Sequence, residues 1–214
     1  KRTMRSTPRR SWQSITLTTL WMKICLSTAP TRCWQGYINS GTAEFYERTF
    51  NFREIRYFDI EGQKTGLLSR AMVSPCGKIK IPINESTDEQ SQIEEYIREY
   101  QGEGIQHVAL GSDDIYRSVD QLKRSDICFQ SVPDSYYASV AKRTCGRKEN
   151  PDELKQRQIL IDGDIKQGIL LQIFTQNLIG PIFFEIIQRK GNEGFGEGNF
   201  QALFESIELE QIRR

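Results

Sequence analysis

Hydrophobic residues from position 43 onward recur with the spacings of short helices and strands. One helix is expected at 43–50, and a second where apolar residues recur three and four positions apart between Ile93 and Tyr100. Short apolar or alternating runs predict strands at 52–60, 67–74, 78–84 and 105–110. This first unit therefore reads as a helix, three strands, a second helix and a strand.

A second unit repeats this order. One helix has its inward face at Ile115, Val119 and Leu122 and can be capped by Ser112 or Asp113. Another helix starts after Pro133-Asp134, and Phe200, Leu203, Phe204 and Ile207 predict a last one. Strands are predicted near 127–131 and at 157–162, 168–175 and 181–189. The pattern alone supports an α+β fold rich in antiparallel strands.

The first 43 residues have a different character. They contain no Asp or Glu, seven of the Lys and Arg residues, and all three tryptophans, at Trp12, Trp21 and Trp34. A basic arm or transit-like peptide is one interpretation, because such peptides are rich in Arg and Ser and poor in acids. Translation out of frame is the other. We expect residues 1 to about 40 to be disordered and to form no strand of the fold.

The composition narrows the functional classes. A formal net charge of +1 argues against a general nucleic-acid-binding or membrane-binding protein, and no run is long and apolar enough to span a bilayer. The five cysteines form no CxxC pair, which is typical of a reduced, cytoplasmic chain rather than a disulfide scaffold. The length suits one domain or two small modules. Because the chain begins at Lys1, we expect a fragment.

Two polar residues lie inside apolar runs that are typical of core strands. His107, the single histidine, lies in the run Gly104–Leu110, and Glu185 lies in the run Ile182–Ile187. A buried charge is costly unless it is paired or bound to a metal. One imidazole and one carboxylate are two thirds of a mononuclear iron site, and strand alternation lets the two side chains meet if their faces line one cavity. An ordinary core histidine is the alternative.

Several longer motifs follow one another from Phe45 to the C-terminus. They are Phe45-Tyr46-Glu47, Phe50–Ile60, Pro82–Glu85, Gln106-His107, Leu171–Thr175 and Gly194–Phe200. In this order they resemble the C-terminal half of the 4-hydroxyphenylpyruvate dioxygenase family. The resemblance ends abruptly near Ala43, which favours the out-of-frame interpretation of residues 1–43.

The resemblance implies the vicinal-oxygen-chelate (glyoxalase/dihydroxybiphenyl dioxygenase-like) fold, an α+β fold of paired βαβββ modules that curl around a metal. The domain would cover residues 44–214, with modules at roughly 44–110 and 111–214. The metal would be Fe(II), with His107 and Glu185 as two ligands. Counting back without gaps places the third, a histidine, near Ala29, where the chain has none, and Cys33 has the wrong spacing. We therefore expect the chain as written to turn over poorly or not at all.

The resemblance also implies a pocket for the substrate. Its aromatic, substrate-binding positions match Phe174, Phe183, Phe195 and Phe200, and Asn199 is expected to bind substrate too. Its polar positions match Ser69, Asn84, Gln92 and Gln172, which the resemblance implies are catalytic. Gln106 matches a polar position too, but as the neighbour of His107 it should point away. The phenylalanines could instead be ordinary core, Ser69 and Asn84 could be strand-end or turn residues, and Gln92 could be a solvated helix position.

Glycines 194, 196 and 198 form a GxGxG string, which is a weak nucleotide signal by itself. The string does not open a helix after a strand within a βαβ unit, so we exclude a dinucleotide site. A hinged segment that lets the C-terminal helix close over the pocket fits better, with Phe195 and Phe200 touching the ligand.

The function implied by the resemblance is oxidation of 4-hydroxyphenylpyruvate, a 2-oxo acid, by O₂ to homogentisate and CO₂ in tyrosine breakdown, by an enzyme that is a homo-oligomer when complete. Two alternatives remain open. Hydroxymandelate synthase uses the same substrate and ligands and differs in where oxygen is delivered. A non-catalytic truncated relative is favoured by the missing first histidine.

Overall fold

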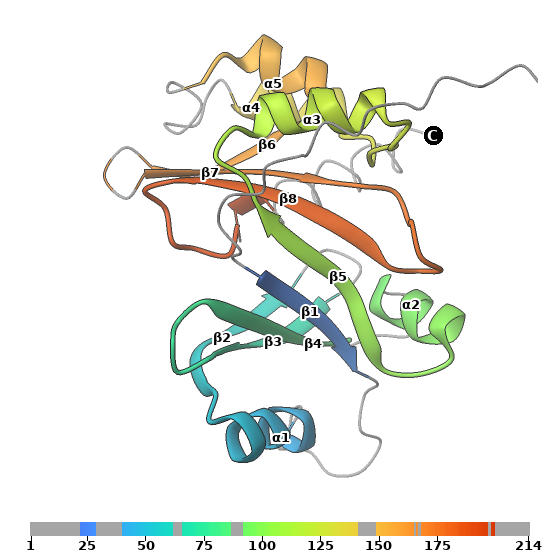
Figure 1. Ribbon diagram of the computed structural model, residues 1–214, viewed down its shortest axis with the longest axis vertical. Coiled ribbons are helices and arrows are strands. Elements are labelled where there is room, and N and C mark those ends of the chain that lie inside the picture. The colour runs from blue at the N-terminus through green and yellow to red at the C-terminus, as the bar shows by residue number, and fades with distance from the viewer. Residues whose placement is uncertain are drawn as a thin grey trace, which may run out of the picture.

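The computed structural model describes residues 22–28, 40–61, 66–86, 92–140, 149–164, 166, 168–196 and 198–199. Eight strands of this part form one sheet in the order β2-β3-β4-β1-β5-β8-β7-β6. The sheet curves through the middle of the molecule, with α1 below it and α3, α4 and α5 above it in Figure 1. The fold is α+β, as the sequence pattern predicts.

The first module contains one helix and four strands. They are β1 (Met22–Thr28), α1 (Ser40–Phe50), β2 (Arg53–Glu61), β3 (Gly66–Val73) and β4 (Ile79–Ser86). Helix α2 (Gln92–Tyr100) then leads to the second module. The predicted positions of α1, α2, β2, β3 and β4 are confirmed to within two residues, except that α1 begins at Ser40 rather than at residue 43.

The second module contains four strands and three helices. They are β5 (Gly104–Gly111), α3 (Ile115–Arg124), α4 (Asp134–Val140), α5 (Pro151–Arg157), β6 (Leu160–Asp164), β7 (Gly168–Phe174) and β8 (Phe183–Lys190). The predicted strand at 127–131 is wrong, because Phe129 makes only an isolated bridge to Thr175. Helix α5 was missed, although Asn150 caps it and Pro151 occupies its first turn.

The expectation that residues 1 to about 40 form no strand is wrong for residues 22–28. They form β1, which pairs in parallel with β4 and antiparallel with β5 at the centre of the sheet. Strand pairing uses main-chain N–H and C=O groups, so it does not depend on the side chains that the sequence comparison reads. The last predicted helix, from Phe200 onward, lies outside the described residues.

The strand pairings repeat one pattern in the two halves of the sheet. β1 lies parallel to β4, and β5 lies parallel to β8. The two halves meet where β1 and β5 run antiparallel. On this pairing we group β5 with β8 in the second module, and the expected division near residue 110 stays a prediction.

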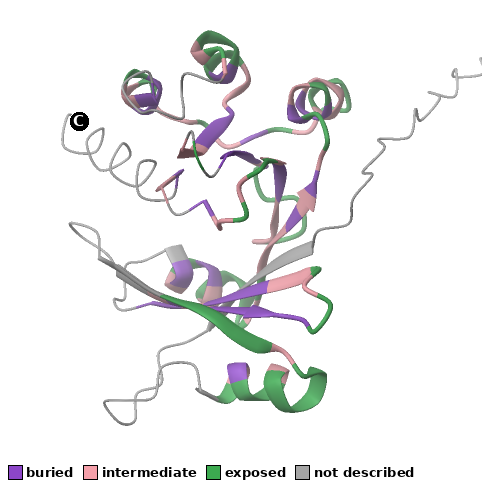
Figure 2. Cartoon of the chain, turned by 90° about the vertical axis from the view of Figure 1, so that its left-hand side faces the viewer, coloured by how far each residue is buried: buried purple, intermediate pink, exposed green. Residues whose placement is uncertain are grey.

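The larger hydrophobic core lies in the second module, between the helices and the sheet. It includes Val119, Tyr136 and Leu154 from the three helices and Leu171 and Ile186 from the strands. The first module has a smaller cluster under α1. Figure 2 shows the difference, because α1 is mostly exposed while helices of the second module carry buried stripes.

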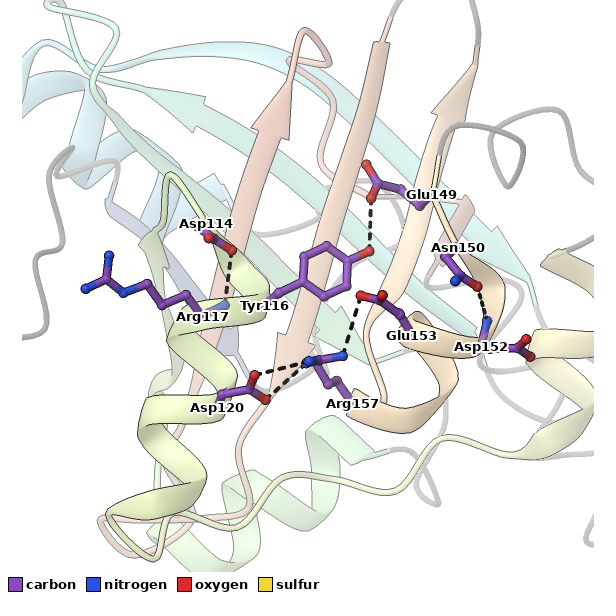
Figure 3. Close-up of polar contacts among 9 residues, drawn as sticks. All are labelled: Asp114, Tyr116, Arg117, Asp120, Glu149, Asn150, Asp152, Glu153 and Arg157. Atoms are coloured by element: carbon purple, nitrogen blue, oxygen red, sulfur yellow. Dashed lines mark hydrogen bonds and ion pairs between the residues drawn. The ribbon is translucent and has the colours of Figure 1, made fainter.

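Polar contacts connect the helices of the second module (Figure 3). Arg157 at the end of α5 donates two hydrogen bonds to the Asp120 carboxylate on α3, at 3.0 and 3.2 Å. Its guanidinium also lies 5.5 Å from the centre of the Tyr116 ring. Tyr116 in turn donates to Glu149 at 2.9 Å.

Among the described helices, none is long and apolar enough to cross a membrane.

Candidate metal centre

Strands β5 and β8 bring His107 and Glu185 together. The strands are parallel neighbours, with His107 opposite Phe183 and Ala109 opposite Glu185. His107 Nε2 lies 3.6 Å from Glu185 Oε2. The Glu185 side chain is fully buried and that of His107 is 12% exposed. A carboxylate in such a place needs an opposite charge, a hydrogen bond or a metal to offset its lost hydration.

The two atoms are close enough to share one ion. Ligand atoms about 2.0–2.2 Å from a divalent metal can lie up to roughly 4.2 Å apart, and the observed separation is 3.6 Å. An imidazole nitrogen and a carboxylate oxygen also suit a first-row metal. No group of three His, Cys, Asp or Glu side chains suited to a metal occurs in the described part of the chain. The donor set therefore fits two positions of a metal centre.

The main chain at the seam between the modules places β1 beside these ligands. Cys25 is the register partner of His107 across the antiparallel pair of β1 and β5. The Ala29 position, where the first histidine was expected, lies outside the described residues.

Two of the expected substrate-binding phenylalanines flank the imidazole. The Phe183 ring stacks on His107 with 4.8 Å between ring centres and a 20° angle between planes. Phe174 approaches His107 edge-on at 6.2 Å and Phe183 edge-on at 6.1 Å. Both phenylalanines are half-buried. They fix the plane of the imidazole and place an apolar surface beside the two candidate ligands.

Gln172 and Asn199 lie directly behind the carboxylate. Gln172 Nε2 donates to Glu185 Oε1 at 2.7 Å, and Asn199 Nδ2 donates to Gln172 Oε1 at 2.7 Å. Gln172 is 2% exposed and Asn199 1% exposed. Both expected residues are thus beside Glu185, and their amides are already occupied by these bonds.

The expected polar residues of the first module form a separate pair. Ser69 on β3 and Asn84 on β4 are direct cross-strand partners on one face of the sheet, with Ser69 buried and Asn84 half-buried. Gln106 precedes His107 on β5, so strand alternation turns it to the opposite face. The side chain of Gln92 and the whole of Phe200 lie outside the described residues.

The glycine-rich loop at 191–199 is tied to both modules. Lys80 of β4 lies 3.5 Å from Glu193 and 5.5 Å from the centre of the Phe195 ring. Gly198 N–H donates to the Asp162 carboxylate of β6 at 2.9 Å. The expected phenylalanine at 195 therefore contacts the first module although it follows the last strand of the second.

Tyr136 on α4 is a member of the site that the sequence did not reveal. Its hydroxyl donates to Asn199 Oδ1 at 2.8 Å and accepts from the Ile161 N–H at 2.9 Å. The residue is fully buried. A buried tyrosine needs a polar partner, and this was the available signal, but the sequence does not show that the partner comes from a loop 63 residues away.

Comparison with known proteins shows what the chain is similar to. Residues 41–144 match the Glyoxalase/Bleomycin resistance protein/Dioxygenase superfamily. The chain is 66% identical over 171 residues to a 4-hydroxyphenylpyruvate dioxygenase of Pseudomonas aeruginosa, and this match covers 79% of the chain and 48% of the relative. The sequence is therefore similar to about half the length of the 4-hydroxyphenylpyruvate dioxygenases, the family that the motifs resemble.

Two further relatives of this superfamily extend the comparison. The chain is 68% identical over 173 residues to a protein named Hemolysin VllY from Vibrio vulnificus, covering 80% of the chain and 48% of that protein. Among solved structures, a mutant of 4-hydroxymandelate synthase from Streptomyces coelicolor matches with a TM-score of 0.76 and 29% identity, covering 90% of the chain and 54% of that structure. The chain spans about half the length of the relatives it matches.

Proposed function

We propose that this chain forms the iron-binding part of a 4-hydroxyphenylpyruvate dioxygenase, which converts that 2-oxo acid and O₂ to homogentisate and CO₂ in the cytoplasm. The observation that carries the proposal is the 3.6 Å approach of His107 Nε2 to the buried Glu185 carboxylate. The high identity to dioxygenases over about four fifths of the chain supports the same reaction.

His107 and Glu185 would hold Fe(II) through one nitrogen and one oxygen. Such an ion leaves open positions at which a 2-oxo acid and O₂ can bind side by side. The protein supplies the rest. The carboxylate is oriented by the hydrogen bond that Gln172 donates to it, and the imidazole is held in plane by Phe183.

The remaining expected residues would receive the organic substrate. Phe174 and Phe183 offer apolar faces for an aromatic ring, and Phe195 in the 191–199 loop adds a third. Ser69 and Asn84 of the first module carry the hydroxyl and amide suited to a phenol or a carboxylate. We assign Gln92 and Phe200 to the same pocket on the motif match alone.

The third ligand decides how active the chain is. His107 is the single histidine of the sequence, so a second imidazole cannot come from this chain. Even a change in a residue that only supports a metal ligand typically lowers affinity or activity about 10–100-fold. The chain as written should therefore bind iron weakly and turn over slowly.

The alternative product, hydroxymandelate, has weaker support. The solved synthase is 29% identical to the chain, whereas the Pseudomonas dioxygenase is 66% identical. The two enzymes share substrate and ligands, so product analysis separates them.

The test is product detection on two proteins, each given Fe(II) anaerobically and then substrate and O₂. One is the chain as written, and the other has residues 1–43 replaced by a strand with histidine near position 29 and the N-terminal half of a relative supplied. We expect homogentisate only from the second. Hydroxymandelate from the second would select the alternative, and abundant homogentisate from the first would contradict the assigned ligand set.

A further inference from the structure

A row of hydrogen bonds runs from the main chain of β6 to the Glu185 carboxylate. Ile161 N–H donates to the Tyr136 hydroxyl at 2.9 Å. This hydroxyl has two acceptors within reach, Asn199 Oδ1 at 2.8 Å and the Ile161 carbonyl at 3.2 Å, and the shorter contact places its proton on Asn199. The row continues from Asn199 to Gln172 and from Gln172 to Glu185, at 2.7 Å each. Its four bonds connect a helix, a loop and three strands.

The chemistry of the last acceptor sets the direction of every bond in the row. An ionised carboxylate only accepts hydrogen bonds, so Gln172 must turn its NH₂ group to Glu185 and its oxygen away. The oxygen of Gln172 then requires a donor, which Asn199 supplies with its own NH₂ group. The oxygen left on Asn199 requires a donor in turn, and the Tyr136 hydroxyl supplies it. Hydrogen bonds aligned in one sense strengthen one another in a buried site.

We propose that Tyr136 is a positioning residue of the metal centre. Its hydroxyl fixes the amides of Asn199 and Gln172, and these hold Glu185 Oε1 so that Oε2 stays turned toward His107. The proposal rests on the assignment of Glu185 as a metal ligand, and it adds a residue that contacts neither metal nor substrate. Tyr136 is suited to this role because helix packing buries it completely and the Ile161 main chain fixes its oxygen.

The adjacent Tyr137 provides a matched control. It is also buried, at 5% exposed, and among the described residues its hydroxyl has no hydrogen-bond partner. Burial raises the pKa of the Tyr137 phenol above its usual range, so its proton stays in place. Tyr136→Phe and Tyr137→Phe therefore remove the same atom from neighbouring positions, and only the first change interrupts the row.

The experiment uses the full chain with isotope-labelled Asn and Gln side-chain amides, and it uses Co(II) as the metal probe. We expect Tyr136→Phe to shift the Gln172 and Asn199 amide signals, to change the visible spectrum of bound Co(II) and to weaken its binding about 10-fold or more. Tyr137→Phe should change none of these. Asn199→Asp is the second interrupting variant, because an ionised carboxylate cannot donate to Gln172. It should shift the Gln172 signal even if Tyr136→Phe does not fold.

The outcomes separate this proposal from the proposed function. Equal amide signals and Co(II) affinities in the Tyr136→Phe and Tyr137→Phe variants would overturn the positioning role. If the unmodified chain binds no Co(II) at His107, the metal assignment fails, and the positioning role of Tyr136 fails with it. Shifted Gln172 and Asn199 amide signals in the Tyr136→Phe variant would in that case still establish the row of hydrogen bonds. Activity of the iron-loaded protein is not needed for either decision.

Discussion

Glu185 is the residue around which the site is organised. Its carboxylate is fully buried, it lies 3.6 Å from His107, and it accepts a hydrogen bond from Gln172. Transfer of a charged group to such a place costs stability that the hydrogen bond recovers only in part. Burial of the Glu185 charge therefore lowers the free energy of unfolding of the metal-free protein, and a bound metal would offset this loss.

Replacement of this carboxylate should separate stability from metal binding. Glu185→Gln keeps the size and an oxygen that can accept from Gln172, but removes the buried charge. We expect the metal-free variant to be as stable as the parent or more stable by about 1–2 kcal/mol, as measured by urea unfolding without metal. Glu193→Gln is the control: its carboxylate is exposed and its ion pair with Lys80 is long, at 3.5 Å, so the change should lower stability by less than about 1 kcal/mol and should not raise it. Destabilisation by Glu185→Gln in metal-free protein would contradict the assigned cost.

Gly196 is the second residue on which the site depends. Its φ is +80°, and an added Cβ would overlap the Gln172 amide. Gly196→Ala should therefore cost about 2–4 kcal/mol, the sum of backbone strain and displacement of a buried, hydrogen-bonded amide. Gly180 has a φ of +55° and open space around the same position, so Gly180→Ala should cost only about 1 kcal/mol. Thermal unfolding compares the two, and equal losses would show that Gly196 does not confine Gln172.

Local pattern predicted the two candidate ligands but not the residues that hold them. His107 and Glu185 stood out because polar residues inside apolar strands are costly and rare. Tyr136 and Gly196 act through partners distant in sequence, and a single chain gives no distance information. The motif match predicted Gln172 as a catalytic residue and Asn199 as a substrate-binding residue. Their placement behind Glu185, bonded to each other, required the folded structure.

At the scale of elements, β1 is where expectation and structure differ most. The absence of acids, the clustered tryptophans and the lost resemblance all argued against a strand in residues 1–43. Yet Met22–Thr28 pairs with both β4 and β5. A central position in the sheet requires main-chain partners on both sides, and any segment without proline can supply them. The side chains of a strand decide the chemistry of the metal centre, whereas the pairing of β1 with β4 and β5 depends mainly on its main chain.

Strand β1 also offers a position at which the missing imidazole could be supplied. Cys25 is the register partner of His107, whereas Ile24 is the register partner of Val108. Cys25→His should raise Co(II) affinity at least about 10-fold, because it adds an imidazole beside His107. Ile24→His should not. Calorimetric titration of both variants measures this, and equal gains would place β1 in another register.

Helix α5, which sequence periodicity missed, is held to α3 by Arg157 (Figure 3). Arg157 donates two hydrogen bonds to Asp120 and lies over the Tyr116 ring, and both contacts require a flat guanidinium. The Asp120 carboxylate also raises the pKa of Arg157. Arg157→Lys should destabilise the protein by about 0.5–1 kcal/mol in urea unfolding. The exposed pair between Arg157 and Glu153 is longer, at 3.7 Å, so Glu153→Gln should cost less. A larger loss with Glu153→Gln would reverse this assignment.

At the scale of the whole molecule, the site lies near the seam between two modules of the same pairing pattern. The parallel pairs of β1 with β4 and β5 with β8 close the modules, and the antiparallel pair of β1 and β5 joins them. Both identified candidate ligands come from the second module. The first contributes the strand beside them, the Ser69 and Asn84 pair, and the Lys80 contacts to the loop. Sequence periodicity predicted most of the strands, but which strands become neighbours depended on pairings between distant parts of the chain.

The central claim is that His107 and Glu185 bind one metal ion, and the single histidine makes it directly measurable. Anaerobic Fe(II) is titrated into the chain while the imidazole signals are followed by NMR, and these can arise only from His107. We predict selective broadening of these signals in the unmodified chain, and at least about 10-fold more metal for the same broadening in the Glu185→Gln variant. His107 signals that stay sharp with excess Fe(II), or that broaden equally in both proteins, would contradict the account.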